Sequence, residues 1–285
     1  MASGDGLIQP LRRAADCTGI DPALLGLGDI DWSAPWLADW RAWGEPLARQ
    51  IVGQGTASTV LTQARHAPVA FVPQAMLPEG VAYETFIRET AQVPTREGLH
   101  DFFNALCWMH FPQAKARLNR LQAAEIARDG VQARRGPVRD AITVLDENGV
   151  LIQASDALWQ ALCEHRWHDA LVMARGQWSE VRLWVFGHAT LEKLVRPYKS
   201  ITAHLWRVPQ TLQRADIDPW LAQDLQPERL AAKPFAPLPL LGVPGWWTAN
   251  VDPGFYDDPA VFRPARQRRA SPEKPPSATG MPSIT

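Results

Sequence analysis

The sequence has little cysteine and no long apolar run, and both absences exclude classes of protein. Its three cysteines, Cys17, Cys107 and Cys163, are widely spaced and form no Cys-x-x-Cys pair. Neither a disulfide framework nor a thiolate zinc site is therefore predicted. The most apolar late stretch, PFAPLPLLGVPGWW, is broken by prolines and is shorter than the roughly 20 residues that a membrane-spanning helix needs. Because the N-terminal stretch also has no apolar signal-peptide core, we expect a soluble cytoplasmic protein without a membrane partner.

Neither sign of charge dominates the chain, and several familiar catalytic patterns are missing. The formal net charge is −1, so no field of the whole protein attracts nucleic acid or an anionic membrane. The sequence contains no Gly-x-Ser-x-Gly elbow, Walker A loop or Rossmann glycine pattern, and no RNP, KH or zinc-finger pattern. These absences argue against the common serine hydrolases, nucleotide-binding enzymes and nucleic-acid-binding modules.

What is present is an ordinary globular composition. Hydrophobic residues make up 46% and charged residues 21% of the 285 positions, which is enough to bury a sizeable core. Apolar periodicity predicts helices at residues 45–67, 82–90, 95–110, 113–128, 155–164 and 188–195 and strands at 181–186 and 201–208. The Asn148-Gly149 pair between the apolar runs 141–145 and 150–154 predicts a β-hairpin. Helices and strands that do not alternate strictly favour an α+β fold, a single domain of helices packed on a small, mostly antiparallel sheet.

The composition changes along the chain and predicts its organisation. Residues 1–29 are expected to be a partly ordered N-terminal segment, and residues 30–264 the single domain. Within that domain, 232–264 is rich in proline and aromatic residues and predicts an extended arm laid over the rest. The expected apolar anchors of this arm are Leu240, Trp246, Trp247, Phe255, Tyr256 and Phe262. The basic, Pro/Ser-rich tail 265–285 is predicted to be disordered.

Four tryptophans follow one another near the start of the expected domain. Trp32, Trp36, Trp40 and Trp43 are spaced by 4, 4 and 3 residues, which suits one stripe of a helix. Such a stripe belongs to the core or caps it. The alternative is an aromatic surface for a ligand or partner.

The helix expected at 95–110, with Thr95 as its N-cap, carries unusual polar chemistry. His100, Asp101, Asn104 and Trp108 lie on the face opposite its Phe/Leu stripe. A solvent face usually carries Lys and Glu, so a base, an acid and an amide together suggest a second layer of contacts. One hypothesis makes His100 a general base or metal ligand whose ring is oriented by Asp101 or by a neighbouring residue. The other is a polar face that hydrogen-bonds neighbouring loops.

The next expected helix carries a stripe of Lys115, Asn119, Gln122 and Ile126. Glu125 falls instead on the apolar side, between Leu118 and Leu121 in projection. A carboxylate there must be paired or protonated, because an isolated buried charge is costly. Expected partners are Arg96, Arg135 and Arg139. A structural ion pair is one interpretation, and a catalyst with a perturbed pKa is the other.

Residues 115–139 hold seven basic side chains and two acidic ones, a local excess of five positive charges. This region could bind phosphate or a nucleic-acid backbone. It could equally be a solvated helix and loop.

A third cluster follows the strand expected at 181–186. The chain turns through Gly187 into a short helix in which His188 and Glu192 are one turn apart and could chelate a metal. A lone His-x-x-x-Glu is a weak pattern. Lys199 and His204 follow shortly afterwards, and His204 completes the candidate metal ligands.

Seven segments of the sequence carry a resemblance to a known family. They are VPTREGLHDFFNAL, FPQAKARLNRLQAAEI, RGPVRDAITVLDENG, VFGHATLEKL, ITAH, PLLGVPGWW and FYDDPAVFRP. Together they resemble a bacterial family of uncharacterised proteins, the domain of unknown function 3025. The resemblance covers roughly residues 30–264. It implies a single-domain, soluble, cytosolic protein. It implies no cofactor, substrate or catalytic residue.

Two functional hypotheses remain. The first is an enzyme in which the three polar segments line one cleft and carry out a hydrolytic or phosphoryl-type reaction, assisted by a divalent metal or not. Its catalytic candidates are His100, Asp101, Asn104, His188 and Glu192. Its candidates for binding a small anionic, perhaps phosphorylated, substrate are Lys115, Asn119, Gln122, Arg139 and Lys199. The second hypothesis is a non-catalytic adaptor that binds RNA or a protein through the 115–139 region and the tryptophans.

Overall fold

The computed structural model describes residues 26–54, 56–130 and 136–265. Most of the predicted N-terminal segment and nearly all of the predicted C-terminal tail lie outside these residues. The helices are α2 (Arg41–Gln54), α3 (Ala57–Gln63), α4 (Tyr83–Thr90), α5 (Leu99–His110), α6 (Pro112–Asp129), α7 (Pro137–Asn148), α8 (Asp156–Cys163), α9 (His188–Lys193), α10 (Ile217–Asp224) and α11 (Pro227–Ala231). The strands are β1 (Ala70–Pro73), β2 (Gln92–Thr95), β3 (Gly149–Gln153), β4 (Arg182–Val185), β5 (Thr202–Arg207) and β6 (Ala236–Pro239).

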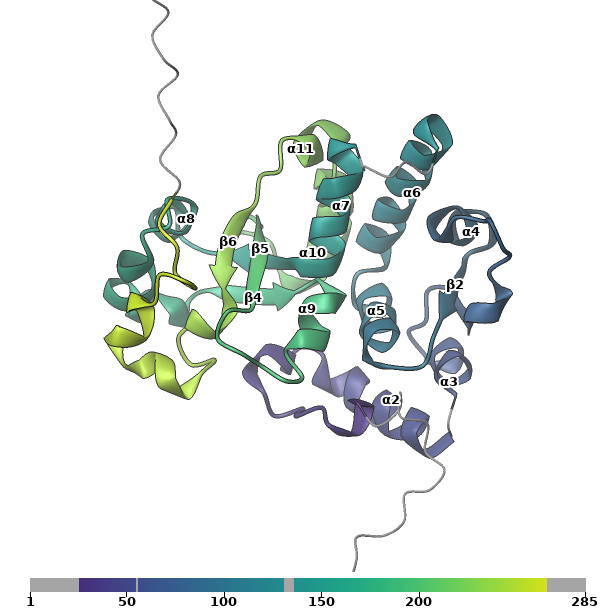
Figure 1. Ribbon diagram of the computed structural model, residues 1–285, viewed down its shortest axis with the longest axis horizontal. Coiled ribbons are helices and arrows are strands. Elements are labelled where there is room, and N and C mark those ends of the chain that lie inside the picture. Colours follow the sequence, from purple (N-terminus) through teal and green to yellow (C-terminus); the bar gives the residue numbers. More distant parts are fainter. Residues whose placement is uncertain (1–25, 55, 131–135, 266–285) are drawn as a thin grey trace, which may run out of the picture.

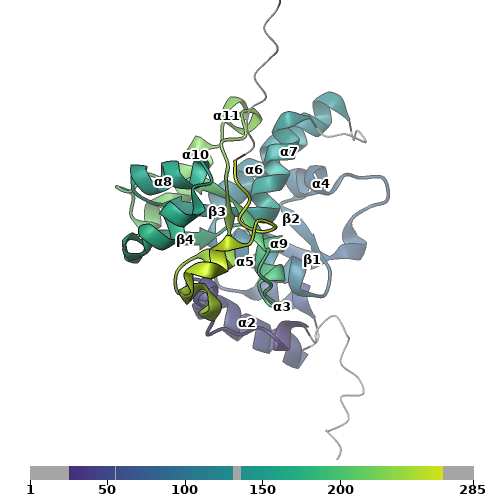
Figure 2. The same ribbon diagram turned by 60° about the vertical axis from the view of Figure 1, so that its left-hand side comes forward.

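Four strands form the main sheet, in the order β4-β3-β5-β6. The outer two pairs are antiparallel, and the central pair, β3 with β5, is parallel. β1 and β2 form a separate parallel pair. Figures 1 and 2 show the main sheet and the β1–β2 pair on opposite sides of a central group of helices that includes α5, α6 and α7. The prediction of a single α+β domain is confirmed. The predicted mostly antiparallel sheet is instead one mixed sheet and one parallel pair, because two of the four strand pairings among the described residues are parallel.

The predicted hairpin around Asn148-Gly149 is wrong. Residues 141–145 belong to α7, and the helix runs directly into β3 at Gly149. Pro137 occupies the first turn, where its missing N–H costs nothing, and Ala141, Ile142 and Leu145 are buried at helical spacing. Gly149 has a negative φ of −77°, so no hairpin turn forms there. A Cβ at this glycine would lie 2.4 Å from the Leu145 carbonyl oxygen, so the glycine permits a tight junction between helix and strand.

The start of the helix expected at 95–110 also differs from the prediction. Thr95 ends strand β2, and the residue that precedes α5 is Gly98, whose φ of 125° favours glycine. The predicted end is confirmed, because α5 stops at His110 and α6 begins at Pro112. The predicted end of the next helix near residue 128 is likewise confirmed, because α6 ends at Asp129 and Gly130 follows with a φ of 70°.

The four early tryptophans do not form a single helical stripe. Trp36 lies in a short 3-10 helix (Pro35–Leu37) and Trp43 in α2, while Trp32 and Trp40 occupy turns. Trp32, Trp36 and Trp40 are nevertheless buried in the core. Their role is therefore packing.

The segment 232–264 contributes strand β6 and then short 3-10 helices that lie on the domain. Leu240, Tyr256 and Phe262 are buried anchors, as predicted. Asn250 is fully buried and donates to the carbonyls of Leu241 and Val243. Within the described ranges, no helix combines the length and apolar character that crossing a bilayer requires.

Candidate functional site

A cavity of about 580 Å³ is lined mainly by helices α4, α5, α6 and α7. Figure 1 shows α5, α6 and α7 between the main sheet and β2, with α9 beside them and α4 on the far side of α6, next to β2. The polar side chains that line the cavity are Gln74, Tyr83, Glu84, Arg96, His100, Asp101, Asn104, Lys115, Asn119, Gln122, Arg139, Thr143, Asp146, Glu147 and His188. Most of the residues singled out from the sequence are therefore brought together around one space.

The predicted stripe of α6 faces this cavity. Lys115, Asn119, Gln122 and Ile126 all line it, because positions three and four apart share one side of a helix. On α5, His100, Asp101, Asn104 and Trp108 line it as well. The polar faces of two consecutive helices thus turn toward each other instead of toward solvent.

A buried ion pair lies at the centre of the lining. The Lys115 ammonium donates to Asp146 Oδ1 at 2.5 Å and to Asn104 Oδ1 at 2.8 Å. Burial alone would lower the pKa of Lys115, but the Asp146 carboxylate raises it above its usual value. Burial likewise opposes ionisation of Asp146, yet Lys115 and His188 hold its pKa below the usual range. Both groups are therefore charged, and each neutralises the other.

Two further buried groups of the lining come from α4. Asn119 donates to the Glu84 carboxyl at 2.7 Å and to the Glu84 carbonyl at 2.8 Å. Burial raises the pKa of Glu84, and it also raises that of Tyr83. The Tyr83 hydroxyl accepts from Asn104 at 3.3 Å. Residue 104 thus links the α4 wall to the Lys115–Asp146 pair.

Asp101 is committed to the loop that precedes α5. Arg96 binds its carboxylate through Nε at 3.0 Å and Nη2 at 3.1 Å, and the Arg96 backbone N–H donates at 2.6 Å. The hypothesis that Asp101 orients His100 receives no support from these contacts. The carboxylate that contacts His100 Nδ1 is that of Glu192.

Four side chains from three helices form a connected cluster at the α9 side of the cavity. His100 Nδ1 lies 2.8 Å from Glu192 Oε2, and His100 Nε2 lies 3.1 Å from His188 Nε2. His188 Nε2 is in turn 3.4 Å from Glu147 Oε2. Burial lowers the pKa of His188 to about 4, although Asp146 opposes that shift. Burial and the neighbouring Asp146 raise the pKa of Glu147.

The backbone at Gly187 makes this cluster possible. A Cβ there would lie 2.5 Å from the Glu147 carbonyl oxygen and 2.6 Å from the Asn148 nitrogen. Only glycine therefore allows the start of α9 to approach the end of α7 so closely. That approach places His188 beside Glu147.

Two of the predicted site residues lie away from the cavity. Lys199 pairs with Asp258 at 3.1 Å and lies over the Phe255 ring, so it anchors the C-terminal arm. The His204 ring packs at the edge of Phe235, and His204 does not belong to the potential ligand cluster found among the described residues, which is His100, Glu147 and His188. Glu192 is outside the cavity lining but reaches His100. The region 187–204 therefore supplies only His188 to the wall that it was expected to form.

The basic region 115–139 is less cationic than its sequence suggests. Lys115 is neutralised by Asp146, and Arg128 pairs with Glu125 at 2.9 Å and with Asp129 at 2.7 Å. Among the described residues, Glu125 pairs with Arg128, one turn away on α6, instead of with the predicted Arg96 or Arg139, and the third predicted partner, Arg135, lies outside these residues. Residues 131–135 lie outside the described ranges. Glu125 and Asp129 are already included in the local excess of five positive charges, so only Asp146 lowers that excess, to four.

Sequence reasoning missed Tyr83, Glu84, Asp146 and Glu147 as cavity residues. The last two were assigned to a hairpin turn, which would have pointed them to solvent. The helical spacing of Ala141, Ile142 and Leu145 after Pro137 was the signal that could have placed them on a helix.

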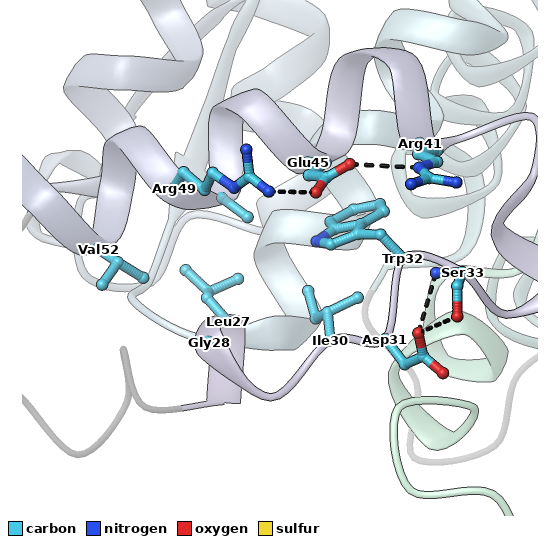
Figure 3. Close-up of a pocket in the computed structure, with 11 residues that line it drawn as sticks. Leu27, Gly28, Ile30, Asp31, Trp32, Ser33, Arg41, Glu45, Arg49 and Val52 are labelled. Atoms are coloured by element: carbon cyan, nitrogen blue, oxygen red, sulfur yellow. Dashed lines mark hydrogen bonds and ion pairs between the residues drawn. The ribbon is translucent and has the colours of Figure 1, made fainter.

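A second cavity, of about 450 Å³, lies between the N-terminal segment and α2 (Figure 3). Its charged residues already satisfy one another. Glu45 accepts from both Arg41 and Arg49, and Asp31 accepts from Ser33 (Figure 3). This cavity is therefore the weaker candidate for a site.

Comparison with known proteins gives the family but no function. No curated protein and no solved structure shows a significant match. The sequence matches the family described as "Protein of unknown function (DUF3025)" over residues 69–266, more than half of the chain and nearly the whole lining of the main cavity. The chain therefore belongs to the DUF3025 family.

Proposed function

We propose that the protein is an enzyme that hydrolyses a small anionic molecule bound in the cavity between α4, α5, α6 and α7. The convergence of His100, Glu147 and His188 on one point of that cavity carries the proposal. Hydrolytic sites commonly contain side chains that accept a proton and bind a water molecule at the wall of a cavity.

Arg139 is the residue proposed to hold the anionic part of the substrate. It lines the cavity from α7, and its buried Nε has no hydrogen-bond partner among the described residues. The other two cations of the lining, Lys115 and Arg96, already bind carboxylates. A guanidinium offers a planar fork that matches a carboxylate or phosphate. Gln122, on the same wall, adds an amide for orientation.

The reaction needs no second substrate besides water. A water held by the His100, Glu147 and His188 cluster attacks the acyl or phosphoryl atom of the substrate. The new bond to the water oxygen replaces the bond to the leaving oxygen, and the proton of the water passes to that leaving oxygen. Acid–base groups that assist such a transfer contribute typically about 10²–10⁴-fold in rate.

The test uses three chromogenic probes: p-nitrophenyl phosphate, bis-p-nitrophenyl phosphate and p-nitrophenyl acetate. The wild-type protein should hydrolyse at least one of them. Glu147→Gln should then lower kcat by about 10²-fold or more, and Arg139→Ala should raise KM for a phosphate probe. Arg120→Ala is the matched control, because this exposed arginine lies on α6 outside the cavity. Absence of hydrolysis of all three probes, or an unchanged rate in Glu147→Gln, would overturn the proposal.

A further inference from the structure

We infer that His100, Glu147 and His188 bind one divalent transition-metal ion, with Zn²⁺ as the first choice. The inference deepens the function proposed above, because the ion would supply the attacking water. Binding of the ion can nevertheless be measured without any substrate.

The distances between the three donor atoms fit one ion. The two Nε2 atoms of His100 and His188 are 3.1 Å apart, and Glu147 Oε2 is 3.4 Å from the His188 nitrogen. All three donor atoms lie within 4.8 Å of one another. Bonds from zinc to imidazole nitrogen of about 2.0–2.1 Å, at tetrahedral or octahedral angles, place two such nitrogens roughly 2.9–3.4 Å apart. The two pairs that include His188 Nε2 thus already have the spacing of ligands on one ion, and the His100–Glu147 pair lies within 4.8 Å.

The hydrogen bond of the His100 ring favours the tautomer that a metal needs. Glu192 accepts from His100 Nδ1, at 2.8 Å, which keeps the proton on Nδ1 and leaves a lone pair on Nε2. This carboxylate–histidine arrangement is the common outer support of a metal ligand. His188 Nδ1 is buried and has no hydrogen-bond partner among the described residues, and Asp146 Oδ2 lies 3.8 Å from it. The two Nε2 atoms face each other at 3.1 Å, a contact that requires either a proton on one of them or a cation between them.

The ligand set selects the class of ion. Two imidazole nitrogens and one carboxylate oxygen suit Zn²⁺, Fe²⁺ or Mn²⁺, whereas Mg²⁺ and Ca²⁺ prefer oxygen donors alone. Three protein ligands leave at least one coordination position for water, as in catalytic zinc sites. A zinc-bound water has a pKa near about 7, which makes it a nucleophile at neutral pH. The metal therefore supplies the hydroxide that the proposed reaction uses.

The charge of the cavity lining supports a cation on independent grounds. Four carboxylates and three cations line the cavity: Glu84, Asp101, Asp146 and Glu147 against Arg96, Lys115 and Arg139. With every group ionised, this lining carries an excess of one negative charge. That excess repels the anionic substrate proposed above. A divalent ion reverses the sign to one positive charge and makes anion binding favourable.

The test is calorimetric titration of the untagged full chain with ZnCl₂ after chelator treatment. We expect one Zn²⁺ per chain for the wild-type protein. Glu147→Gln and His188→Asn should weaken binding by at least about 100-fold, and Glu192→Gln, which removes only the outer support, by about 10–100-fold. His168→Asn is the matched control, because this exposed histidine lies away from the cluster. Thermal melts of each variant without metal identify any that fails to fold, and Glu192→Gln retains all three ligands.

Zinc binding below one ion per chain, or unchanged affinity in Glu147→Gln and Glu192→Gln, would overturn the metal site. Two further results separate this inference from the proposed function. Hydrolysis that persists after chelation overturns the role of the ion as the source of the attacking water and leaves the hydrolase proposal in place. Stoichiometric zinc with no hydrolysis of the three probes supports the metal site and overturns the hydrolase proposal.

Discussion

Replacing Lys115 by methionine tests whether the Lys115–Asp146 ion pair organises the cavity. The ammonium side chain is only 5% exposed and its Asp146 partner 20%. Removing one member leaves a buried carboxylate with Glu147 as its neighbour in sequence and without its main counter-charge. Breaking a buried pair in this way costs about 3–5 kcal/mol. For a chain of this size, that corresponds to a fall in Tm of about 6–20 °C.

The assay is urea unfolding followed by circular dichroism at pH 7, on Lys115→Met, Asp146→Asn and the double variant. Loss of both charges removes the unpaired group, so the double variant should be more stable than the sum of the single changes predicts. Lys233→Met is the matched control. Lys233 pairs with Asp140, which lies on α7 like Asp146, but the Lys233 and Asp140 side chains are 47% and 44% exposed. An exposed pair contributes about 0–1 kcal/mol. The reasoning is refuted if Lys115→Met lowers the free energy of unfolding no more than this control does. It is also refuted if the loss in the double variant equals the sum of the losses in the two single variants.

Three more changes probe features outside that pair. His110 is packed between Trp40 and Trp43, and burial, with the Arg214 and His66 charges, lowers its pKa to about 3. Below about pH 6.5, His110 is therefore protonated in the unfolded chain but not in the folded chain. The free energy of unfolding falls by about 2 kcal/mol between pH 7 and pH 5 as a result. His110→Phe should remove that loss in urea unfolding at the two pH values, and an equal slope in both proteins would contradict it. Gly187→Ala forces a Cβ against the α7 backbone and should lower Tm by several degrees. The control, Gly53→Ala in α2, has open space around it and should raise stability by about 0.5–1 kcal/mol. Equal Tm changes in the two variants would contradict this account of the α7–α9 junction. Asn250→Ala removes three side-chain hydrogen bonds, to the Leu241 and Val243 carbonyls and from Arg175 Nη2, and should cost about 2–4 kcal/mol by chemical denaturation. A loss below about 1 kcal/mol would refute its role in the arm.

Much of the fold was predictable from local chemistry. The predicted helix end at residue 110 and the predicted helix start at residue 155 are correct. Pro112 and the Ser155 cap are the local signals there, and both act within a few residues. The polar stripe at Lys115, Asn119 and Gln122 also predicted a site wall, since helical spacing fixes which residues share a face.

What failed depended on long-range packing. Asn148-Gly149 has the composition of a hairpin turn, yet the close approach of the chain at Gly149 and Gly187 needs glycine for another reason. That error concealed Asp146 and Glu147. The spacing of His188 and Glu192 suggested that the two could chelate a metal together, but α5 places His100 between them. The Glu192 carboxylate therefore contacts the His100 ring, and Glu147 contacts the His188 ring. No local pattern encodes the meeting of three helices.

The most direct measurement is an anomalous difference map from crystals of the protein soaked in ZnCl₂, recorded at the zinc absorption edge. A single strong peak within coordination distance of His100 Nε2, His188 Nε2 and Glu147 Oε2, absent in Glu147→Gln, is the predicted result. A peak elsewhere, or none at this cluster, would contradict the central claim that these three side chains form a metal centre at the cavity wall.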